Sequence, residues 1–249
     1  MAGTFEVAAA HSDRSVRIPA PLLDAACQPY RSAGRFAYYF ARGKLKSDPV
    51  YAAILSMGLL QGRSRILDLG CGQGLLAAWL RAAERCAEGG SWPYSWPAAP
   101  KSVSTLGIEL MLADVERARR ALGADAQFLH GDIRTVTYGQ ADAVVILDVL
   151  HYLGAPSQRE ILRRVREALP VDGVLLLRVG DADGGFRFRY GEWTDRIIMW
   201  LRGHGRVATH CRSTTQWRAL LEECGFESAA LPMSQGTPFA NVLLVARAR

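Results

Sequence analysis

The sequence predicts a doubly wound α/β fold, in which helices cover both faces of a mostly parallel sheet. Five short apolar segments alternate with amphipathic helical segments between residues 65 and 180. One of them, residues 142–147, carries three consecutive β-branched side chains, as expected of an inner strand that is buried on both faces. After residue 213, a helical segment is followed by two apolar stretches around a turn. This order favours right-handed crossovers, with an antiparallel hairpin closing one edge of the sheet.

Residues 1–60 are expected to form a helical cap in front of the sheet, after a small and polar first stretch that is expected to fray. Asp48 followed by Pro49 is interpreted as an N-cap with proline at the first helical position. This pair predicts a helix over residues 50–60, which Gly62 ends.

The α/β domain is predicted to span residues 61–249. Its strands are expected at residues 66–69, 103–108, 126–129, 142–147, 174–179, 226–232 and 241–246, and its helices at 75–87, 113–121, 157–169 and 213–224. Ser157 is the expected N-cap of the third of these helices. Residues 88–102 are rich in proline and tryptophan, and residues 181–212 in aromatic and arginine side chains. Both stretches are interpreted as insertions into the domain.

The charge of the chain first suggests a polyanion as partner, because 30 basic residues outnumber 24 acidic ones. Only Lys44, Lys46 and Lys101 are lysines, and every other basic residue is an arginine. The arginines alternate with Asp and Glu, and no four basic residues are consecutive. In an alanine-rich chain this pattern indicates compositional bias instead of a dedicated polyanion groove. Nucleic acid is therefore not the expected partner.

The cysteines are five in number and show no C-x-x-C spacing. The sequence therefore indicates neither a disulfide framework nor a zinc knuckle, and no bound metal is expected. The N-terminus does not resemble a secretory signal, and no apolar stretch approaches the roughly 20 residues that span a bilayer. These features predict a cytoplasmic protein without a membrane span.

The segment that carries the chemistry joins the first predicted strand to its helix and reads Asp68-Leu69-Gly70-Cys71-Gly72-Gln73-Gly74. Glycines let a ligand approach the backbone closely, and the helix that follows presents unpaired N–H groups. A dinucleotide fingerprint needs G-x-G-x-x-G, whereas the third glycine here comes one residue early. Asp68 would repel a phosphate but would pair with an ammonium group. The loop therefore favours an amphoteric, phosphate-free ligand over a nicotinamide dinucleotide.

These residues resemble the first motif of the class I S-adenosylmethionine-dependent methyltransferases, an acidic residue followed by G-x-G-x-G. The resemblance extends over about residues 63–180. It implies a Rossmann-like sheet of seven strands with an antiparallel last strand, and S-adenosylmethionine as the cofactor. The cofactor-binding residues that it implies are Asp68, Gly70, Cys71, Gly72, Gly74, Glu109, Leu110, Asp132, Ile133 and Asp148.

The resemblance gives the acidic residues after the later strands separate roles. Glu109 would accept hydrogen bonds from both ribose hydroxyls, which suits a carboxylate because its oxygens only accept. Asp132 would contact the adenine amino group, Ile133 would pack on the adenine face, and Asp148 would lie near the transferred methyl group. Ordinary alternatives stay open, namely a helix N-cap for Glu109, a turn residue for Asp132 and a structural role for Asp148.

His151 is the candidate catalytic residue, since it follows Asp148 by three residues at the rim of the expected pocket. A histidine titrates near neutrality, which suits a general base toward a hydroxyl or phenol. A capping or packing role is the alternative. Residues 148–151 depart from the Asn/Asp-Pro-Pro-aromatic pattern of nucleic-acid amino methylation. The resemblance is therefore to the small-molecule branch of the family, and no magnesium-dependent mechanism is indicated.

The expected substrate is a small aromatic or apolar metabolite, and an anionic group or a carrier-protein tether on it is compatible with the sequence. Aromatic side chains in residues 31–60, and aromatics with arginines in residues 181–212, would lie over the carboxyl ends of the strands, where open α/β sheets bind ligands. Two alternatives stay open. An RNA or protein methyltransferase is supported by the basic charge, and a non-catalytic cofactor-binding protein is opposed by the complete glycine motif.

Overall fold

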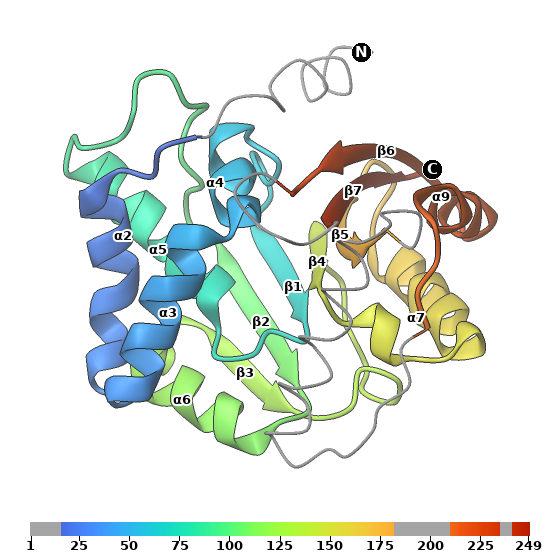
Figure 1. Ribbon diagram of the computed structural model, residues 1–249, viewed down its shortest axis with the longest axis horizontal. Helices are drawn as coiled ribbons and strands as arrows, with labels where there is room; N and C mark the ends of the chain where they lie inside the picture. The colour runs from blue at the N-terminus through green and yellow to red at the C-terminus, as the bar shows by residue number, and fades with distance from the viewer. Residues whose placement is uncertain (1–15, 182–209, 235–240) are drawn as a thin grey trace.

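The sheet has seven strands in the order β3-β2-β1-β4-β5-β7-β6. The computed structural model describes residues 16–181, 210–234 and 241–249, which are coloured in Figure 1. The strands are β1 (Arg65–Leu69), β2 (Ser104–Glu109), β3 (Gln127–His130), β4 (Ala143–Leu147), β5 (Val174–Gly180), β6 (Phe226–Pro232) and β7 (Asn241–Ala248). Neighbours among β1 to β5 pair in parallel, whereas β7 is antiparallel to both β5 and β6. The predicted fold class, with its antiparallel last strand, is confirmed.

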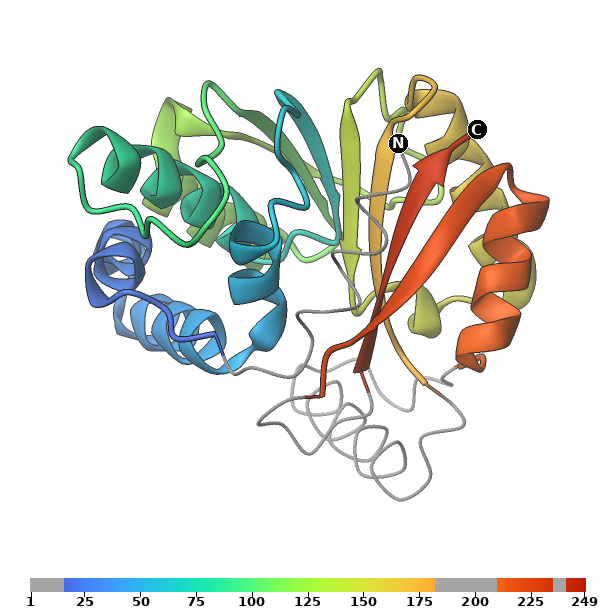
Figure 2. The same cartoon turned by 90° about the horizontal axis from the view of Figure 1, so that it is seen from above.

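Helices cover both faces of the sheet, as Figure 2 shows. The described α-helices are α2 (Ala20–Cys27), α3 (Arg35–Ser47), α4 (Pro49–Ser56), α5 (Leu75–Glu88), α6 (Leu112–Leu122), α7 (Ala155–Ala168) and α9 (Thr214–Glu223). Successive β4 side chains enter two separate cores. Ala143 and Val145 pack in the core with α2 to α6, while Val144 and Ile146 pack in the core with α7 and α9. Burial of both faces explains why this strand is apolar throughout.

The N-terminal helices are fastened to the domain by buried hydrogen bonds. Helix α2 packs on α5, and the short 3-10 helix η1 (Gln28–Arg31) packs on α6. The buried Tyr30 hydroxyl donates to the Gln73 carbonyl at 2.8 Å. The Trp79 indole of α5 donates to the Tyr51 carbonyl of α4 at 2.9 Å. The first helices therefore reach both the glycine loop and the helix that follows it.

Helix α4 begins where the sequence predicts and ends earlier than predicted. The Asp48 side chain accepts a hydrogen bond from the Val50 amide at 3.1 Å, which confirms the N-cap. The prediction that the helix continues to residue 60 and ends at Gly62 is wrong. Gly58 adopts φ +64°, and the amides of Gly58 and Leu59 donate back to the Leu55 and Ile54 carbonyls. This Schellman pattern ends the helix four residues earlier.

Helix α7 also starts earlier than predicted. Its N-cap is Gly154, so the assignment of Ser157 as N-cap is wrong, and Pro156 lies within the first turn. Proline is favoured at that end because its missing N–H has no helical partner there. In α9, by contrast, Ser213 is the N-cap and forms a capping box with Gln216.

Residues 89–103 connect α5 to β2 without a helix or a strand. Trp92 and Trp96 pack edge to face at 5.4 Å, and the Trp92 indole donates to the Pro97 carbonyl at 2.9 Å. Both indoles are half-buried against the core, so the connection is a packed loop with a small aromatic centre.

Several predicted features lie outside the described residues. They are the first 15 residues, most of the turn expected at residues 234–238, and most of the predicted insertion at 181–212, of which 182–209 are not described. Among the helices that are described, none is both long enough and apolar enough to cross a membrane.

Candidate active site

The glycine loop, residues 70–74, lies between the carboxyl end of β1 and the start of α5. Its three glycines have different surroundings. Gly70, Gly72 and Gly74 all have positive φ, between +54° and +77°. A Cβ on Gly70 would lie 2.3 Å from Val149 Cγ2, and one on Gly74 would lie 2.6 Å from Phe128 Cζ. A Cβ on Gly72 would meet no atom within 4 Å. Gly70 and Gly74 therefore permit close packing, while Gly72 borders open space that a ligand can enter.

Glu109, at the end of β2, is hydrogen-bonded to the glycine loop. Its Oε2 accepts the Gly72 amide at 2.9 Å, and its Oε1 accepts the Met111 amide at 2.9 Å. A carboxylate has about four lone-pair sites, so each oxygen retains a site for another donor. Leu110, which follows, exposes 57% of its surface at the same edge. Two predicted cofactor contacts, Gly72 and Glu109, are thus joined before any ligand binds.

Asp68 is buried within the sheet, with only 4% of its surface exposed. Its strand neighbours are Gly107 on β2 and Val145 on β4. Burial, together with the nearby charge of Glu109, raises the pKa of Asp68 to about 7. A cationic ligand group beside Asp68 would favour the ionised carboxylate.

Cys71 fills the space that Gly107 leaves free, since a Cβ at Gly107 would lie 2.6 Å from the Cys71 sulfur. The thiol is buried, and burial raises its pKa well above the ordinary value. The amides of Gly70 and Cys71 both donate to the Ile108 carbonyl. Cys71 therefore packs the loop against β2 and is not an activated nucleophile.

Asp132 and Ile133 follow β3, and both are engaged by their own loop. The Arg134 guanidinium donates to both oxygens of Asp132, and this hydrogen bonding lowers the pKa of the carboxyl. The Ile133 side chain is 7% exposed and packs in the core beside α7. The predicted adenine contacts of these two residues stay predictions.

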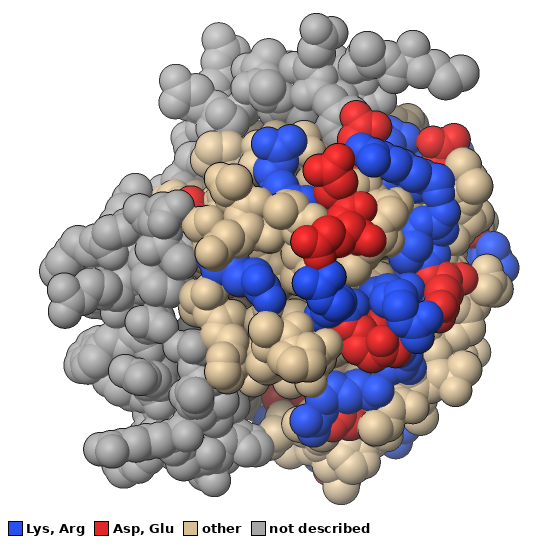
Figure 3. Space-filling model, turned by 90° about the vertical axis from the view of Figure 1, so that its right-hand side faces the viewer, with Lys and Arg blue, Asp and Glu red and all other residues tan. Residues whose placement is uncertain are grey.

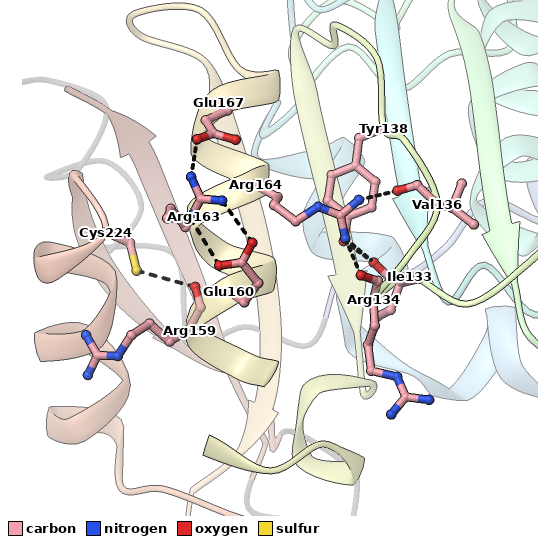
Figure 4. A network of polar contacts seen from close by, with 10 residues as sticks. All are labelled: Ile133, Arg134, Val136, Tyr138, Arg159, Glu160, Arg163, Arg164, Glu167 and Cys224. Carbon is pink, nitrogen blue, oxygen red and sulfur yellow. Dashed lines mark hydrogen bonds and ion pairs between the residues drawn. The ribbon is translucent and has the colours of Figure 1, made fainter. Parts of the chain in front are cut away.

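Arg164 on α7 holds this loop in place, as Figure 4 shows. Its guanidinium donates to the carbonyls of Ile133, Arg134 and Val136, and it lies 4.2 Å from the ring centroid of Tyr138. The Tyr138 hydroxyl donates to the Ile133 carbonyl at 2.5 Å. No motif in the sequence indicates this set of contacts.

Asp148 follows β4 with φ +60° and forms a partly buried ion cluster with residues of β5 and the N-terminal helices. Arg178 of β5 donates through Nε to Asp148 Oδ1 at 2.8 Å, and its other nitrogens bind Asp148 Oδ2 and Asp48 Oδ1. Lys44 Nζ lies 2.8 Å from Asp48 Oδ2 and 3.7 Å from Asp148 Oδ2. Burial opposes the charge of Asp148, but Arg178 and Lys44 outweigh it and lower the pKa of that carboxyl. Asp148 is therefore unsuited to act as a base.

His151 lies in the short 3-10 helix η3 (Leu150–Tyr152), and only 7% of its surface is exposed. Its ring packs against Tyr152 at 4.0 Å between centroids. The buried Gln158 of α7 donates to the Leu150 and Leu153 carbonyls on either side. The backbone around His151 is therefore fixed at the carboxyl end of β4.

The described side chains offer no metal centre, because nowhere in the described ranges do three His, Cys, Asp or Glu side chains gather closely enough to hold an ion. The cysteines at positions 27, 71, 86 and 224 carry free thiols.

The chain matches the family model described as a methyltransferase domain over residues 38–231. This chain belongs to that family. The match covers the glycine loop, all the predicted cofactor contacts and His151, and it confirms the resemblance to the S-adenosylmethionine-dependent methyltransferases.

Curated relatives of the methyltransferase domain also match. The chain is 32% identical over 143 residues to carboxy-S-adenosyl-L-methionine synthase from Chromohalobacter salexigens, which covers 53% of this chain and 48% of that protein. It is 28% identical over 162 residues to the synthase of the same name from Photorhabdus laumondii, covering 59% and 58% respectively. The chain thus spans about half the length of the curated relatives it matches.

Solved structures of methyltransferases share the fold. An O-methyltransferase family protein from Burkholderia thailandensis superposes with a TM-score of 0.60 at 19% identity, over 88% of this chain and 61% of that one. An O-methyltransferase of neocarzinostatin biosynthesis, in complex with S-adenosyl-L-homocysteine and 1,4-dihydroxy-2-naphthoic acid, gives 0.57 at 22% identity, over 91% and 60%. At these identities the likeness shows the fold alone.

The residues of this methyltransferase domain fit S-adenosylmethionine, the cofactor of the family. The open side of Gly72 lets a ligand approach the backbone, and Asp68 offers a carboxyl for an ammonium group. Glu109 has acceptor sites left for two ribose hydroxyls. Sequence reasoning found these three residues, but it missed Tyr30, Arg164 and Arg178, which hold the surrounding loops.

Proposed function

We propose that this protein transfers a methyl group from S-adenosylmethionine to a small molecule, with an oxygen as the acceptor atom. The single observation that carries the proposal is the open space beside Gly72, whose amide is hydrogen-bonded to Glu109, with the buried Asp68 carboxyl near enough to Glu109 to respond to its charge. When bound, the cofactor supplies an activated methyl group on a sulfonium. The chain then has to orient the two reactants and exclude water, since the leaving group needs no further activation.

His151 is the residue we assign as the general base of this reaction. An acceptor hydroxyl has to lose its proton as the methyl arrives, and a neutral imidazole ring nitrogen can take it. Asp148 is a poor base, because Arg178 and Lys44 outweigh burial and lower the pKa of its carboxyl. This proposal assigns Asp148 a structural role and His151 the chemical one.

A small substrate, with an aromatic or apolar body and optionally an anionic group, is favoured over RNA or protein by the charge pattern of the surface. On the face that carries α7 and α9, basic side chains are interspersed with acidic ones (Figure 3). Arg163 pairs with both Glu160 and Glu167, and Arg159 pairs with Glu223. The described side chains of this face thus form no continuous positive stripe for a nucleic acid backbone. A carrier protein as a second partner, and a cytoplasmic location, belong to the same proposal.

The curated relatives support a second candidate function. Their name states that they make a carboxylated S-adenosylmethionine. A protein with that function needs a carboxyl donor as its second substrate: the cofactor's methyl group would lose a proton and gain the carboxyl group, and the decarboxylated donor would take up the proton. Mass spectrometry of the ligand that co-purifies, and of the cofactor after turnover, distinguishes the two functions by the mass of an added carboxyl group.

Calorimetry with S-adenosyl-L-homocysteine, followed by transfer from methyl-labelled cofactor into a metabolite extract, tests the proposal. We expect binding by the wild type, loss of binding in Gly72→Trp, and one labelled small product. Absence of binding by the wild type overturns the assignment. Binding without any labelled product supports a non-catalytic binding protein. A second variant tests the role of His151. We expect His151→Ala to bind S-adenosyl-L-homocysteine with wild-type affinity, and its rate of methyl transfer no longer to increase with pH.

A further inference from the structure

The ion cluster at the carboxyl end of the sheet joins three parts of the chain that are far apart in sequence. It consists of Lys44 at the end of α3, Asp48 at the start of α4, Asp148 after β4 and Arg178 on β5, and we call it the charge quartet. Arg178 exposes 1% of its surface and contacts both carboxylates. Its two positive and two negative charges balance, so the quartet has no surplus charge with which to attract a ligand.

A quartet of this kind, with Arg178 and Asp48 buried and Lys44 and Asp148 half-buried, is a poor stabiliser. Removing charges from water costs as much as their mutual attraction returns, and apolar side chains of similar volume are often equally stable. The benefit of such a cluster lies in the geometry it imposes, because each charged group accepts few alternative positions. The question is therefore which geometry the quartet fixes.

On one side, the quartet fixes the turn that presses on the glycine loop. Asp148 has φ +60°, a conformation that costs free energy in a non-glycine residue. Its side chain is held by Arg178, and its amide donates to the Arg178 carbonyl at 3.2 Å. The next residue, Val149, packs so closely on Gly70 that no Cβ fits between them. Holding Asp148 therefore holds Val149 against the cofactor loop.

On the other side, the quartet fixes the N-terminal helices. Asp48 is at once the N-cap of α4 and a partner of Arg178, so the start of that helix is tied to β5. Lys44 ties the end of α3 to the same point. The helices expected to cover the substrate thus meet, at one guanidinium, the turn that packs against the cofactor loop.

We infer that Arg178 is a positioning residue that couples the order of the α3–α4 segment to cofactor binding at the glycine loop. A ligand that stabilises the loop stabilises Val149 and Asp148, and through Arg178 it stabilises the start of α4. By reciprocity, ordering of α3 and α4 raises the affinity for the cofactor. Arg178 itself touches neither the glycine loop nor any predicted cofactor contact other than Asp148. The inference rests on the proposed cofactor site.

Calorimetry and hydrogen exchange of the full chain, with and without S-adenosyl-L-homocysteine, test the coupling. In the wild type we expect the ligand to slow exchange both at the glycine loop and across residues 35–56. In Arg178→Met we expect an affinity lower by about tenfold, in the range of allosteric couplings, and protection confined to the glycine loop. Arg163→Met is the matched control, because it removes an exposed arginine on α7.

A folded Arg178→Met protein that binds with wild-type affinity and protects residues 35–56 overturns the inference. If Arg178→Met does not fold, the triple variant Asp48→Asn, Asp148→Asn, Arg178→Met replaces it, since it leaves no buried charge unpaired. For the triple variant too, weaker binding with protection confined to the glycine loop supports the inference. Wild-type affinity with protection of residues 35–56 overturns it. Failure of the proposed function shows itself separately, because in that case the wild type does not bind the ligand at all.

Discussion

The amide of Gly72 donates a 2.9 Å hydrogen bond to Oε2 of Glu109, so that the glycine loop after β1 and the acidic residue after β2 form one unit. The second Glu109 oxygen accepts the Met111 amide. Two backbone amides therefore orient the Glu109 carboxylate, to which the ribose hydroxyls of the cofactor are expected to donate hydrogen bonds. This preorganisation lowers the entropy cost of binding, and a bound ligand then stabilises the loop further.

Glu109→Gln is expected to weaken S-adenosyl-L-homocysteine binding by about 10- to 100-fold, the range for one lost hydrogen bond to a charged group. The glutamine amide group would point its own N–H toward one of the two backbone donors. Calorimetry measures the effect, and Glu116→Gln on α6 is the control, since that side chain is exposed. Unchanged affinity in Glu109→Gln would remove Glu109 from the cofactor site.

Affinity for S-adenosyl-L-homocysteine is expected to fall as the pH drops below about 7. Asp68 has a pKa near 7 in the ligand-free protein because it is buried beside Glu109, and the ligand ammonium favours its ionised form. Below pH 7, binding must release the proton, so affinity falls by up to about tenfold per pH unit. Because the folded pKa exceeds the unfolded one, the ligand-free fold also loses stability as the pH rises from about 4 to 7.

Titrations in buffers of different ionisation enthalpy measure this proton release directly. Asp68→Asn should bind more weakly at pH 8 and show little dependence on pH. A wild-type affinity that is flat between pH 5 and 8 would contradict the assignment of Asp68 as the partner of the ammonium group.

Arg164→Leu is expected to lower the free energy of unfolding by about 2 kcal/mol, because the part-buried Ile133 and Val136 carbonyls lose hydrogen bonds to a charged donor. It should also weaken cofactor binding, since Ile133 and Asp132 lose the support of their loop. Thermal unfolding and calorimetry measure the two effects. Arg163→Leu, one residue earlier and exposed on the same helix, should leave both quantities unchanged. Equal effects of the two substitutions would refute the special role of Arg164.

Asp48→Asn is expected to cost about 2 kcal/mol of stability at pH 7 and progressively less at low pH. Burial opposes its charge, but Arg178 and Lys44 bring the pKa of Asp48 to about 2. Since this folded pKa is below the unfolded value, the stabilisation is complete above about pH 4 and lost as the pH falls toward 2. Denaturant unfolding at pH 7 and pH 3 measures the difference. Asp24→Asn, in an exposed pair with Arg42, is the control.

The features of the fold that the sequence predicts correctly are those determined by residues close to one another in the chain. The Asp48-Pro49 helix start, the glycine loop and the alternation of strands and helices are local patterns, and each is found where it was expected. The two errors were also local. Gly58 and Gly62 are both good helix terminators in sequence, and Ser157 is by residue type a better N-cap than Gly154, so residue type alone does not select the observed boundaries.

The site was predictable only where parallel strands guarantee proximity. Because β1, β2 and β4 are parallel neighbours, Asp68, Glu109 and Asp148 had to reach one edge of the sheet. What each carboxylate binds was not predictable. In sequence, Arg178 is an ordinary charged residue near the end of an apolar strand. Its partner Asp48 lies 130 positions away. No spacing rule links residues so distant.

Gln73→Met is expected to stabilise the fold. The Gln73 side chain is 2% exposed, and neither of its amide atoms has a hydrogen-bond partner in the described part of the chain. An unpaired buried polar group costs roughly 1–3 kcal/mol, and methionine has a similar length without that cost. Thermal unfolding should show a midpoint higher by roughly 2–4 °C, the shift that about 1 kcal/mol gives in a domain of this size. The exposed Gln140→Met is the control. A lower midpoint would mean that the Gln73 amide is satisfied in the folded protein, and weaker ligand binding despite a higher midpoint would identify its partner as the ligand.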